Sequence, residues 1–324
     1  MKSTRALIPL ALLCAGAAHA QDWTPKRNVE IVVGSVPGGS NDKTARTVER
    51  ILVTNKLVSA SITVVNKPGG GSNLAFAYVN QHPGDGHYLL VGTPGLVTGH
   101  ITGLSQLRYT DFTPIASLVN DYTAFAVNAA APIKTGNDLV ERLLRDPKSL
   151  TIAVGASIGG LQHIAAGLLM KAAGGNARDL KVVAFKGSAE TVTNLLGGHI
   201  DVVTTAAGNA VDHVVAGKLR LVGVAAPQRF GGALSGVPTW KEQGVDVVSG
   251  GWRSIVGPRG LSAAQVAFWE GVLRRATEHP EWKADLERHF WSDYFATSAQ
   301  FRKMLDQEYA DTRAVLTDLG LARQ

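Results

Sequence analysis

Short apolar runs rich in β-branched residues alternate along the chain with longer stretches whose apolar positions recur every three to four residues. The first pattern is typical of buried strands and the second of amphipathic helices. In the first half the predicted strands are 29–33, 62–65, 88–91, 112–118 and 124–127, and the predicted helices are 42–57, 73–81 and one from Thr98 onwards. Strands that alternate with helices predict a mostly parallel, doubly wound α/β sheet.

The alternation continues through the second half. The predicted strands are 150–154, 181–184, 202–205, 219–224 and 252–256, and the predicted helices are 136–145, 161–173, 188–196, 208–216, 262–279 and 299–319. Thr239 with Glu242 and Ser262 with Gln265 have the spacing of capping boxes, and the second of these opens the helix that runs to about His279.

The chain contains no long Ser/Pro-rich linker, so any domain boundary must be a crossover. We expect the chain to pass into a second lobe near Asp121 and to return near Val237. Lobe 1 is then 21–121 plus 238–324, and lobe 2 is 122–237. Two crossing segments form a hinge, and ligands of such folds bind outside the carboxyl ends of the strands. The predicted fold is therefore two doubly wound α/β lobes joined by a hinge, with the ligand in the cleft between them.

The first twenty residues have the features of a secretory signal peptide. Lys2 and Arg5 precede the apolar stretch 6–17, and the A-x-A motif 18–20 predicts cleavage after Ala20. The one cysteine, Cys14, belongs to the apolar stretch, so we expect a mature chain with no disulfide, thiolate metal site or cysteine nucleophile. The sequence therefore predicts export to an oxidising compartment.

The number and distribution of charged side chains limit the classes of molecule that the protein can bind. Without Lys2 and Arg5, 30 of the 32 basic side chains remain against 26 acidic ones, and they are scattered rather than clustered. This pattern argues against nucleic-acid binding and favours, at most, small anionic ligands. The nine histidines form no H-E-x-x-H motif, and we expect no metal and no cofactor.

Three glycine-rich turns follow apolar strands, at 34–42, 68–73 and 155–160. Glycine lets the backbone approach a ligand, and free N–H groups at a helix start attract anions, although such turns also occur where a chain merely reverses. In the first turn Ser35, Gly38, Gly39 and Ser40 are candidate ligand contacts, whereas Asp42 is placed to cap the following helix. Walker A and G-x-G-x-x-G patterns are absent from these turns, which disfavours nucleotide binding.

The segment 155–159 also matches G-x-S-x-G between a strand and a helix, as in a hydrolase nucleophile elbow. This match leaves open a secreted serine esterase with Ser157 as nucleophile. Its Asp and His partners would come from Asp201 with His213, or from Asp246 with His279 or His289. Arg253 offers a planar fork to a carboxylate or, equally, to a surface salt bridge.

A set of loose motifs, in this order, resembles the extracytoplasmic solute-binding proteins of tripartite tricarboxylate transporters, the Bug/TctC family. They cover essentially the whole mature chain and lie at 31–33, 37–42 with 45–46, 65–73, 83–90, 111–115, 185–188, 196–201, 216–220 and 237–239.

The resemblance implies a periplasmic-binding-protein-like fold that holds a small organic carboxylate, without catalysis, for the membrane permease subunits of such a transporter. It also implies a monomer and leaves open a sensor that signals to a membrane receptor. The residues it places on the ligand are Ser35, Gly38, Gly39, Ser40, Ser72, Asn73, Thr93, Ala156, Ser157, Gly159, Gly160, Lys186, Ser188, Thr205 and Arg253. The identity of the carboxylate does not follow from the sequence.

Overall fold

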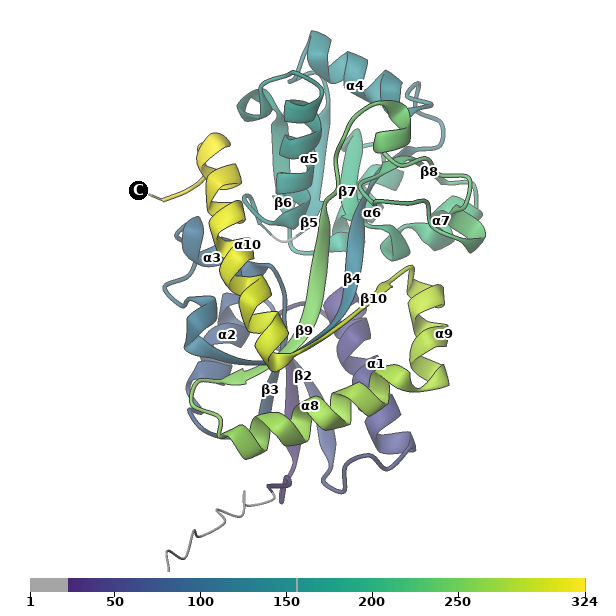
Figure 1. Cartoon of the computed structure of the whole chain (residues 1–324). Helices are drawn as coiled ribbons and strands as arrows, with labels where there is room; N and C mark the ends of the chain where they lie inside the picture. The colour runs from purple at the N-terminus through teal and green to yellow at the C-terminus, as the bar shows by residue number, and fades with distance from the viewer. Residues whose placement is uncertain (1–22, 156, 324) are drawn as a thin grey trace, which may run out of the picture.

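The computed structural model describes residues 23–155 and 157–323, which form two α/β lobes, one above the other in Figure 1. The predicted signal peptide lies outside these residues. The lower lobe contains β1 (Val29–Val33), β2 (Ile62–Asn66), β3 (Tyr88–Gly92), β9 (Gly250–Pro258), β10 (Ser292–Thr297) and the first part of β4 (Phe112–Asn128). Its helices are α1 (Ser40–Thr54), α2 (Asn73–Asn80), α3 (Gly95–Ile101), α8 (Ala263–Glu278), α9 (Pro280–His289) and α10 (Ser298–Asp318).

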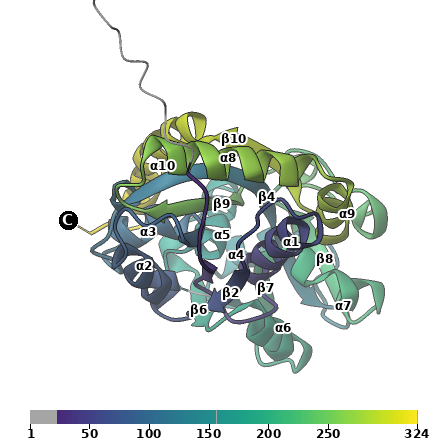
Figure 2. The same ribbon diagram turned by 90° about the horizontal axis from the view of Figure 1, so that it is seen from below.

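The sheet of the lower lobe is covered on both faces. Along β1, Ile31 packs in a core cluster with Trp269 of α8, whereas the next residue, Val32, packs with Phe76 of α2. Adjacent side chains of a strand point to opposite faces, so the continuous apolar run of β1 fills two cores. Figure 2 shows these layers from below, with α8 on one side of the lobe and α2 on the other.

The upper lobe is built in the same way. Its strands are β5 (Thr151–Gly155), β6 (Lys181–Phe185), β7 (Val202–Ala206), β8 (Leu219–Val224) and the end of β4, and its helices are α4 (Gly136–Arg145), α5 (Leu161–Ala172), α6 (Ser188–Leu196) and α7 (Val211–Val215). Ile152 and Ala153 belong to core clusters on opposite faces of this sheet. The predicted doubly wound α/β fold is confirmed in both lobes.

Strand pairing joins the lobes into one path, β2-β1-β3-β9-β4-β7-β5-β6. The outer pairs are parallel, as predicted, but β9 runs antiparallel to β3 and β4, and β4 is antiparallel to β7, β8 and β10. The prediction of two strands in 112–127 was wrong. One 17-residue strand pairs with β9 up to Tyr122 and with β7 from Thr123 onwards, so it belongs to both lobes.

The second crossing lies beside the first. Thr123 N–H donates to the carbonyl of Ser249, and Ser249 N–H donates to the carbonyl of Ala225. Trp240 and Val245, which precede this crossing, pack in the core of the upper lobe. We therefore propose that the chain returns to the lower lobe at about Ser249, about ten residues beyond the expected return at Pro238.

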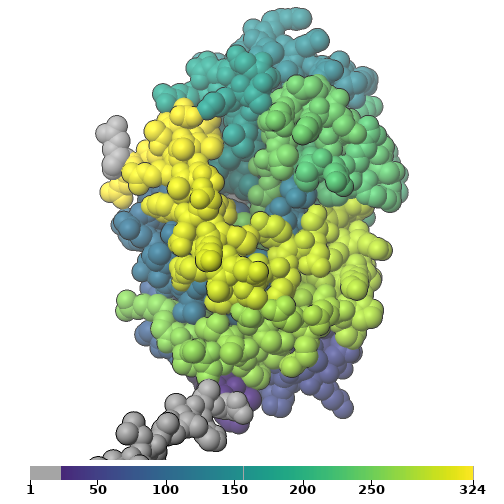
Figure 3. Space-filling view, viewed as in Figure 1, coloured from purple at the N-terminus to yellow at the C-terminus, as the bar shows by residue number. Residues whose placement is uncertain are grey.

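The C-terminal helix α10 lies along the outside of both lobes, in yellow in Figures 1 and 3. Its start packs in the lower lobe through Phe301, and at its end Asp318 forms an ion pair with Lys171 of α5. The hinge is thus accompanied by a third contact between the lobes. Within the described part of the chain, no helix has the length and apolar character needed to cross a bilayer.

Candidate functional site

A cavity of about 910 Å³ lies between the two lobes. Its walls are loops that follow parallel strands: after β1, β2 and β3 in the lower lobe, and after β5, β6 and β7 in the upper lobe. Because the carboxyl ends of both sets of strands meet here, the cavity occupies the position that doubly wound folds use for ligands.

The loop after β1 is held in shape by Asp42, which is buried and does not line the cavity. The carboxylate of Asp42 accepts hydrogen bonds from Gly38 N–H (2.8 Å), Arg46 Nε (2.9 Å) and Asn66 Nδ2 (2.9 Å). Burial alone would raise the pKa of Asp42, but these three donors outweigh it and hold the pKa below its usual value. The acid therefore stays ionised and fixes the loop, while Ser35 and Ser40 face the cavity.

The loop after β2 has an unusual backbone. Gly69, Gly70, Gly71 and Ser72 all have positive φ, which is uncommon for a residue with a side chain such as Ser72. Ser72 Oγ donates to the carbonyl of Gly34 (3.2 Å), and a Cβ on Gly34 would lie only 2.3 Å from Ser72 Cβ. Glycine at position 34 thus allows the first two loops to touch, and this contact holds the strained residue at the cavity.

The upper-lobe loops face these two across the cavity. A Cβ on Gly71 would lie 3.5 Å from Ser157 Oγ, and one on Gly187 would lie 3.6 Å from Val36 Cγ2. A side-chain hydrogen bond of 3.2 Å also crosses between the lobes, from Ser40 Oγ to Asn209 Oδ1. The two lobes therefore touch each other across the cleft.

Four of the helices that begin at the cavity have N-terminal N–H groups without a side-chain cap, whereas at the start of α3 Gly95 N–H donates to Thr93 Oγ1 (3.3 Å). The residues before α1, α2, α5 and α6 are Gly39, Ser72, Gly160 and Gly187, and none of these accepts a capping hydrogen bond. Uncapped first-turn N–H groups, together with the helix dipole, attract an anion. Two of the helices belong to each lobe, so an anion at this point contacts both.

Arg253 on β9 is buried beside the hinge, with 7% of its surface exposed. Its Nη2 donates to Asp121 Oδ2 (2.8 Å) and its Nε donates to Asn41 Oδ1 (3.0 Å), but its Nη1 has no partner among the described residues. Burial raises the pKa of Asp121 above its usual value, against the opposing charge and hydrogen bond of Arg253. Arg253 is therefore a buried, incompletely paired cation in the wall of the cavity.

Positive charge predominates on the cavity wall. Lys43, Lys186 and Arg253 line it, and the one acidic side chain of the described residues that does so is Glu190, which accepts a hydrogen bond from Lys186 N–H (2.9 Å). Low-dielectric walls lined by one sign of charge concentrate ligands of the opposite sign. The cleft thus favours an anion.

The structure brings most of the expected site residues together. The cavity is lined by Ser35, Gly38, Gly39, Ser40, Ser72, Asn73, Thr93, Ser157, Gly160, Lys186, Ser188 and Arg253. Two others lie behind the wall: Thr205 is 1% exposed and accepts from Asn209 Nδ2 (3.4 Å), and Gly159 N–H donates to His163 Nδ1 (2.9 Å). Ala156 lies outside the described residues.

Sequence reasoning missed other residues of the wall, among them Asn41, Lys43, Gln162, Glu190 and Asn209. Lys43 could have been found, since it follows Ser40 by three residues and so shares its face of the helix. Asn209 could also have been found, because it follows a strand whose carboxyl end points to the cleft.

Two of the residues proposed as partners of Ser157 in a serine esterase form hydrogen bonds elsewhere. Asp201 Oδ2 accepts Thr151 N–H (2.8 Å), and His279 Nδ1 accepts Glu281 N–H at the start of α9 (3.3 Å). His163, the histidine nearest to Ser157 in the sequence, accepts the Gly159 N–H, and burial lowers its pKa. No hydrogen bond joins Ser157 Oγ to a histidine within 23–155 and 157–323, and Ser157 lines the cavity.

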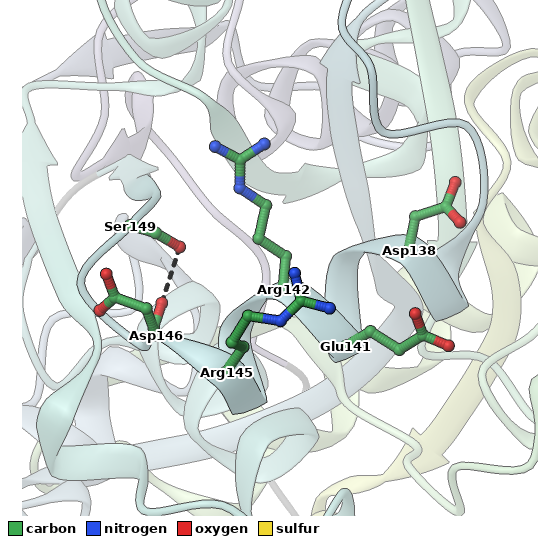
Figure 4. Close-up of a pocket in the computed structure, with 6 residues that line it drawn as sticks. All are labelled: Asp138, Glu141, Arg142, Arg145, Asp146 and Ser149. Atoms are coloured by element: carbon green, nitrogen blue, oxygen red, sulfur yellow. Dashed lines mark hydrogen bonds between the residues drawn. The ribbon is translucent and has the colours of Figure 1, made fainter.

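A second cavity, of about 410 Å³, lies on the upper lobe around α4 (Figure 4). It is lined by Asp138, Glu141, Arg142, Arg145, Asp146 and Ser149. All six residues come from α4 and the turn that follows it, and charges of both signs lie side by side. None of the predicted site residues lies there.

This architecture is that of the two-lobed solute-binding proteins. It consists of two α/β lobes, a hinge of two adjacent strand crossings and a cationic cleft between the lobes. The comparisons with known proteins identify the family within this class. The family model described as "Tripartite tricarboxylate transporter family receptor" (TctC) matches residues 45–321, and the chain belongs to this family. The resemblance noted from the sequence motifs is thus confirmed.

Individual relatives agree with this assignment. A curated protein of Cupriavidus necator, "UPF0065 protein in gbd 5'region", is 28% identical over 315 residues, which cover 96% of this chain and 93% of the relative. A TctC solute-binding protein from Polaromonas is 26% identical with a TM-score of 0.69, covering 91% of this chain and 99% of its own. Rpa4515 of R. palustris, solved with adipate, is 24% identical with a TM-score of 0.84, covering 92% and 99%.

Proposed function

We propose that this protein captures a small organic carboxylate in the cleft between its lobes and delivers it to the permease subunits of a tripartite tricarboxylate-type transporter. The observation that carries the proposal is Arg253, a buried guanidinium in the cavity wall whose Nη1 has no partner in the described structure. A carboxylate at this wall would pair with the Arg253 guanidinium, whose planar fork favours carboxylates.

Closure of the two lobes supplies the remaining donors. The uncapped starts of α1 and α2 in the lower lobe, and of α5 and α6 in the upper lobe, present N–H groups to the same cavity. A carboxylate can accept from both lobes at once only when they meet, so ligand stabilises the closed state through its higher affinity for that state.

The expected location and assembly belong to the same proposal. The chain would work in the periplasm as a monomer after cleavage behind Ala20, and mass spectrometry of the periplasmic form checks the cleavage site. A pull-down of permease subunits by closed, ligand-loaded protein supports delivery to a transporter. Capture of a membrane receptor in their place would favour the sensor role.

The first experiment is a thermal-shift screen of refolded, ligand-free protein against mono-, di- and tricarboxylates, with hydrolysis of p-nitrophenyl acetate measured in parallel. A carboxylate at about 100 times its Kd adds about 2.7 kcal/mol and raises Tm by a few degrees. Arg253→Lys keeps a cation beside Asp121 but lacks the planar fork, so it should fold and bind the same carboxylate at least about tenfold more weakly.

Two results would contradict the proposal. One is a screen in which no carboxylate shifts Tm. The other is ester hydrolysis that is lost in Ser157→Ala, which would return the function to a serine esterase.

A further inference from the structure

The hinge end of the cleft carries more positive than negative charge. Lys43, on the first turn of α1, lines the cavity, is half-buried, and forms no ion pair with another described residue. Arg253 lines the same cavity and is paired with Asp121, which is 2% exposed. Two cations therefore lie near one carboxylate, and that carboxylate is already bonded to Arg253.

The neighbours of Lys43 do not balance its charge. Its ammonium acts on Asp121, whose Oδ2 already accepts from Arg253 Nη2, and on His289 at the end of α9. Burial lowers the pKa of His289, and the charge of Lys43 lowers it further, so this imidazole is neutral at neutral pH. The acidic side chain of the wall, Glu190, belongs to the upper lobe and accepts from Lys186 N–H.

The glycine loops carry no full positive charge that would require a counter-ion. The helix starts at Gly39, Ser72, Gly160 and Gly187 present backbone N–H groups, whose partial charges bind one anionic group without a full counter-ion. The cavity, at about 910 Å³, exceeds what one carboxyl group occupies. It thus contains two separate places for negative charge, one among the helix starts and one at Lys43 and Arg253.

We propose that Lys43 is a specificity-determining residue that, together with Arg253, binds a second anionic group, so that the cleft selects organic dianions over monoanions of the same shape. This inference rests on the proposed function and deepens it, because it names the class of carboxylate and the residue that selects it. An ammonium without an ionic partner in a half-buried wall discriminates by charge, since the uncharged analogue leaves it desolvated and unpaired.

The test compares adipate with monomethyl adipate, which has nearly the same shape and one charge fewer, after a screen of further dicarboxylates with their monoesters. Dissociation constants are measured by calorimetry for the wild type, Lys43→Met, Lys43→Arg and the control Lys283→Met, which removes an exposed lysine on α9. We expect Lys43→Met to weaken binding of the dianion about tenfold or more, to change binding of the monoester by less than about twofold, and to leave the melting curve unchanged. Lys43→Arg should restore most of the preference, and Lys283→Met should match the wild type.

Each result decides a different point. Three results would overturn the role of Lys43 and leave carboxylate binding in place. The wild type could bind only monocarboxylates, Lys43→Met could keep the preference for the dianion, or Lys43→Met could lose both ligands equally. A wild type that binds no carboxylate in the screen overturns the proposed function itself, and this inference with it.

Discussion

Four helices that begin at the cleft start differently from three that begin on the outer surface. Outside, α4, α8 and α10 each begin with a complete capping box, formed by Thr135, Ser262 and Thr297. At the cleft, α1, α5 and α6 follow glycine, and α2 follows a serine with positive φ whose hydroxyl is engaged elsewhere. The chain thus satisfies helix N–H groups where only stability is at stake and leaves them free where a ligand would bind.

Buried charge follows the same division. On the outer surface, the ion pair of Lys171 with Asp318 joins two side chains that are each more than half exposed. At the cleft, Arg253 and Asp121 are both more than nine-tenths buried, and each has one polar atom without a partner in the described structure. Incomplete satisfaction of buried polar atoms costs stability, and it is tolerated here because the site binds a ligand.

The largest effect should come from the buried pair. Arg253→Met leaves the carboxylate of Asp121 buried without its hydrogen-bonded cation, which costs about 3–5 kcal/mol of unfolding free energy in urea titrations. The matched control is Arg178→Met, which removes an exposed arginine that bonds the carbonyls of Thr317 and Asp318 and should cost less than about 1 kcal/mol. Equal losses in the two variants would remove the distinction between buried and surface charge.

The next effect depends on pH and concerns Glu308 of α10, whose carboxylate accepts the indole N–H of the cleft residue Trp252. Burial raises the pKa of Glu308 to about 7, although the bond from Trp252 opposes the shift. Between pH 4.5 and 7 the folded protein keeps a proton that the unfolded chain releases, so the free energy of unfolding falls as pH rises, by about 3 kcal/mol in all.

Glu308→Gln retains an acceptor for Trp252 and has no charge to titrate. We expect the variant to exceed the wild type in stability increasingly between pH 5 and 8, as measured by Tm in matched buffers. Taking the difference between the two proteins cancels the contribution of His100, His163 and His289, whose pKa values burial lowers in both. A constant difference across this range would contradict the raised pKa.

A smaller effect is expected at an outer helix start. Ser262→Ala removes the cap of α8, where Ser262 Oγ accepts Gln265 N–H (3.2 Å), and should cost about 1 kcal/mol of unfolding free energy. The affinity for a carboxylate should stay within about twofold of the wild type, because α8 does not reach the cavity. A tenfold change in Kd would mean that the outer caps are coupled to the cleft.

Most of the elements could be predicted from the sequence because their periodicity is local. Ser262 with Gln265 marked the start of α8 correctly, and the predicted strands lie within a few residues of the observed ones, but α9 and β10 were not predicted. The continuous strand β4 could not be predicted, because Asn120 and Asp121 look like a break. Asp121 is accommodated in a strand only through Arg253, 132 residues further along the chain.

The site was predictable in part for the same reason. Glycine turns after strands are local features and identified most of the wall. The contact of Ser40 with Asn209 joins residues 169 positions apart, and the charge balance around Lys43 depends on Asp121 and His289 from other elements. Residues that are far apart in the sequence meet at the site only once the lobes have packed. A short-range sequence pattern therefore cannot predict these contacts.

The smallest effect on stability is expected when a helix that begins at the cleft is given the cap that it lacks. This change tests directly whether the cleft helices are uncapped because a ligand binds there. Gly39 has extended backbone (φ −72°, ψ 165°), and a Cβ there would lie 3.5 Å from its nearest neighbours, which is ordinary contact. Gly39→Asp therefore fits, and its carboxylate can accept from the first-turn N–H groups of α1, which adds a few tenths of a kcal/mol to the ligand-free protein.

The same carboxylate would occupy the donors that a ligand uses and repel the ligand's charge, so Kd should rise about tenfold or more. Urea titration of ligand-free protein and calorimetry with the carboxylate found in the screen measure the two effects. Gly39→Ser, which caps without charge, should raise Kd by less than the aspartate does. A variant that gains stability and binds as tightly as the wild type would mean that the free N–H groups of α1 are not part of the ligand site.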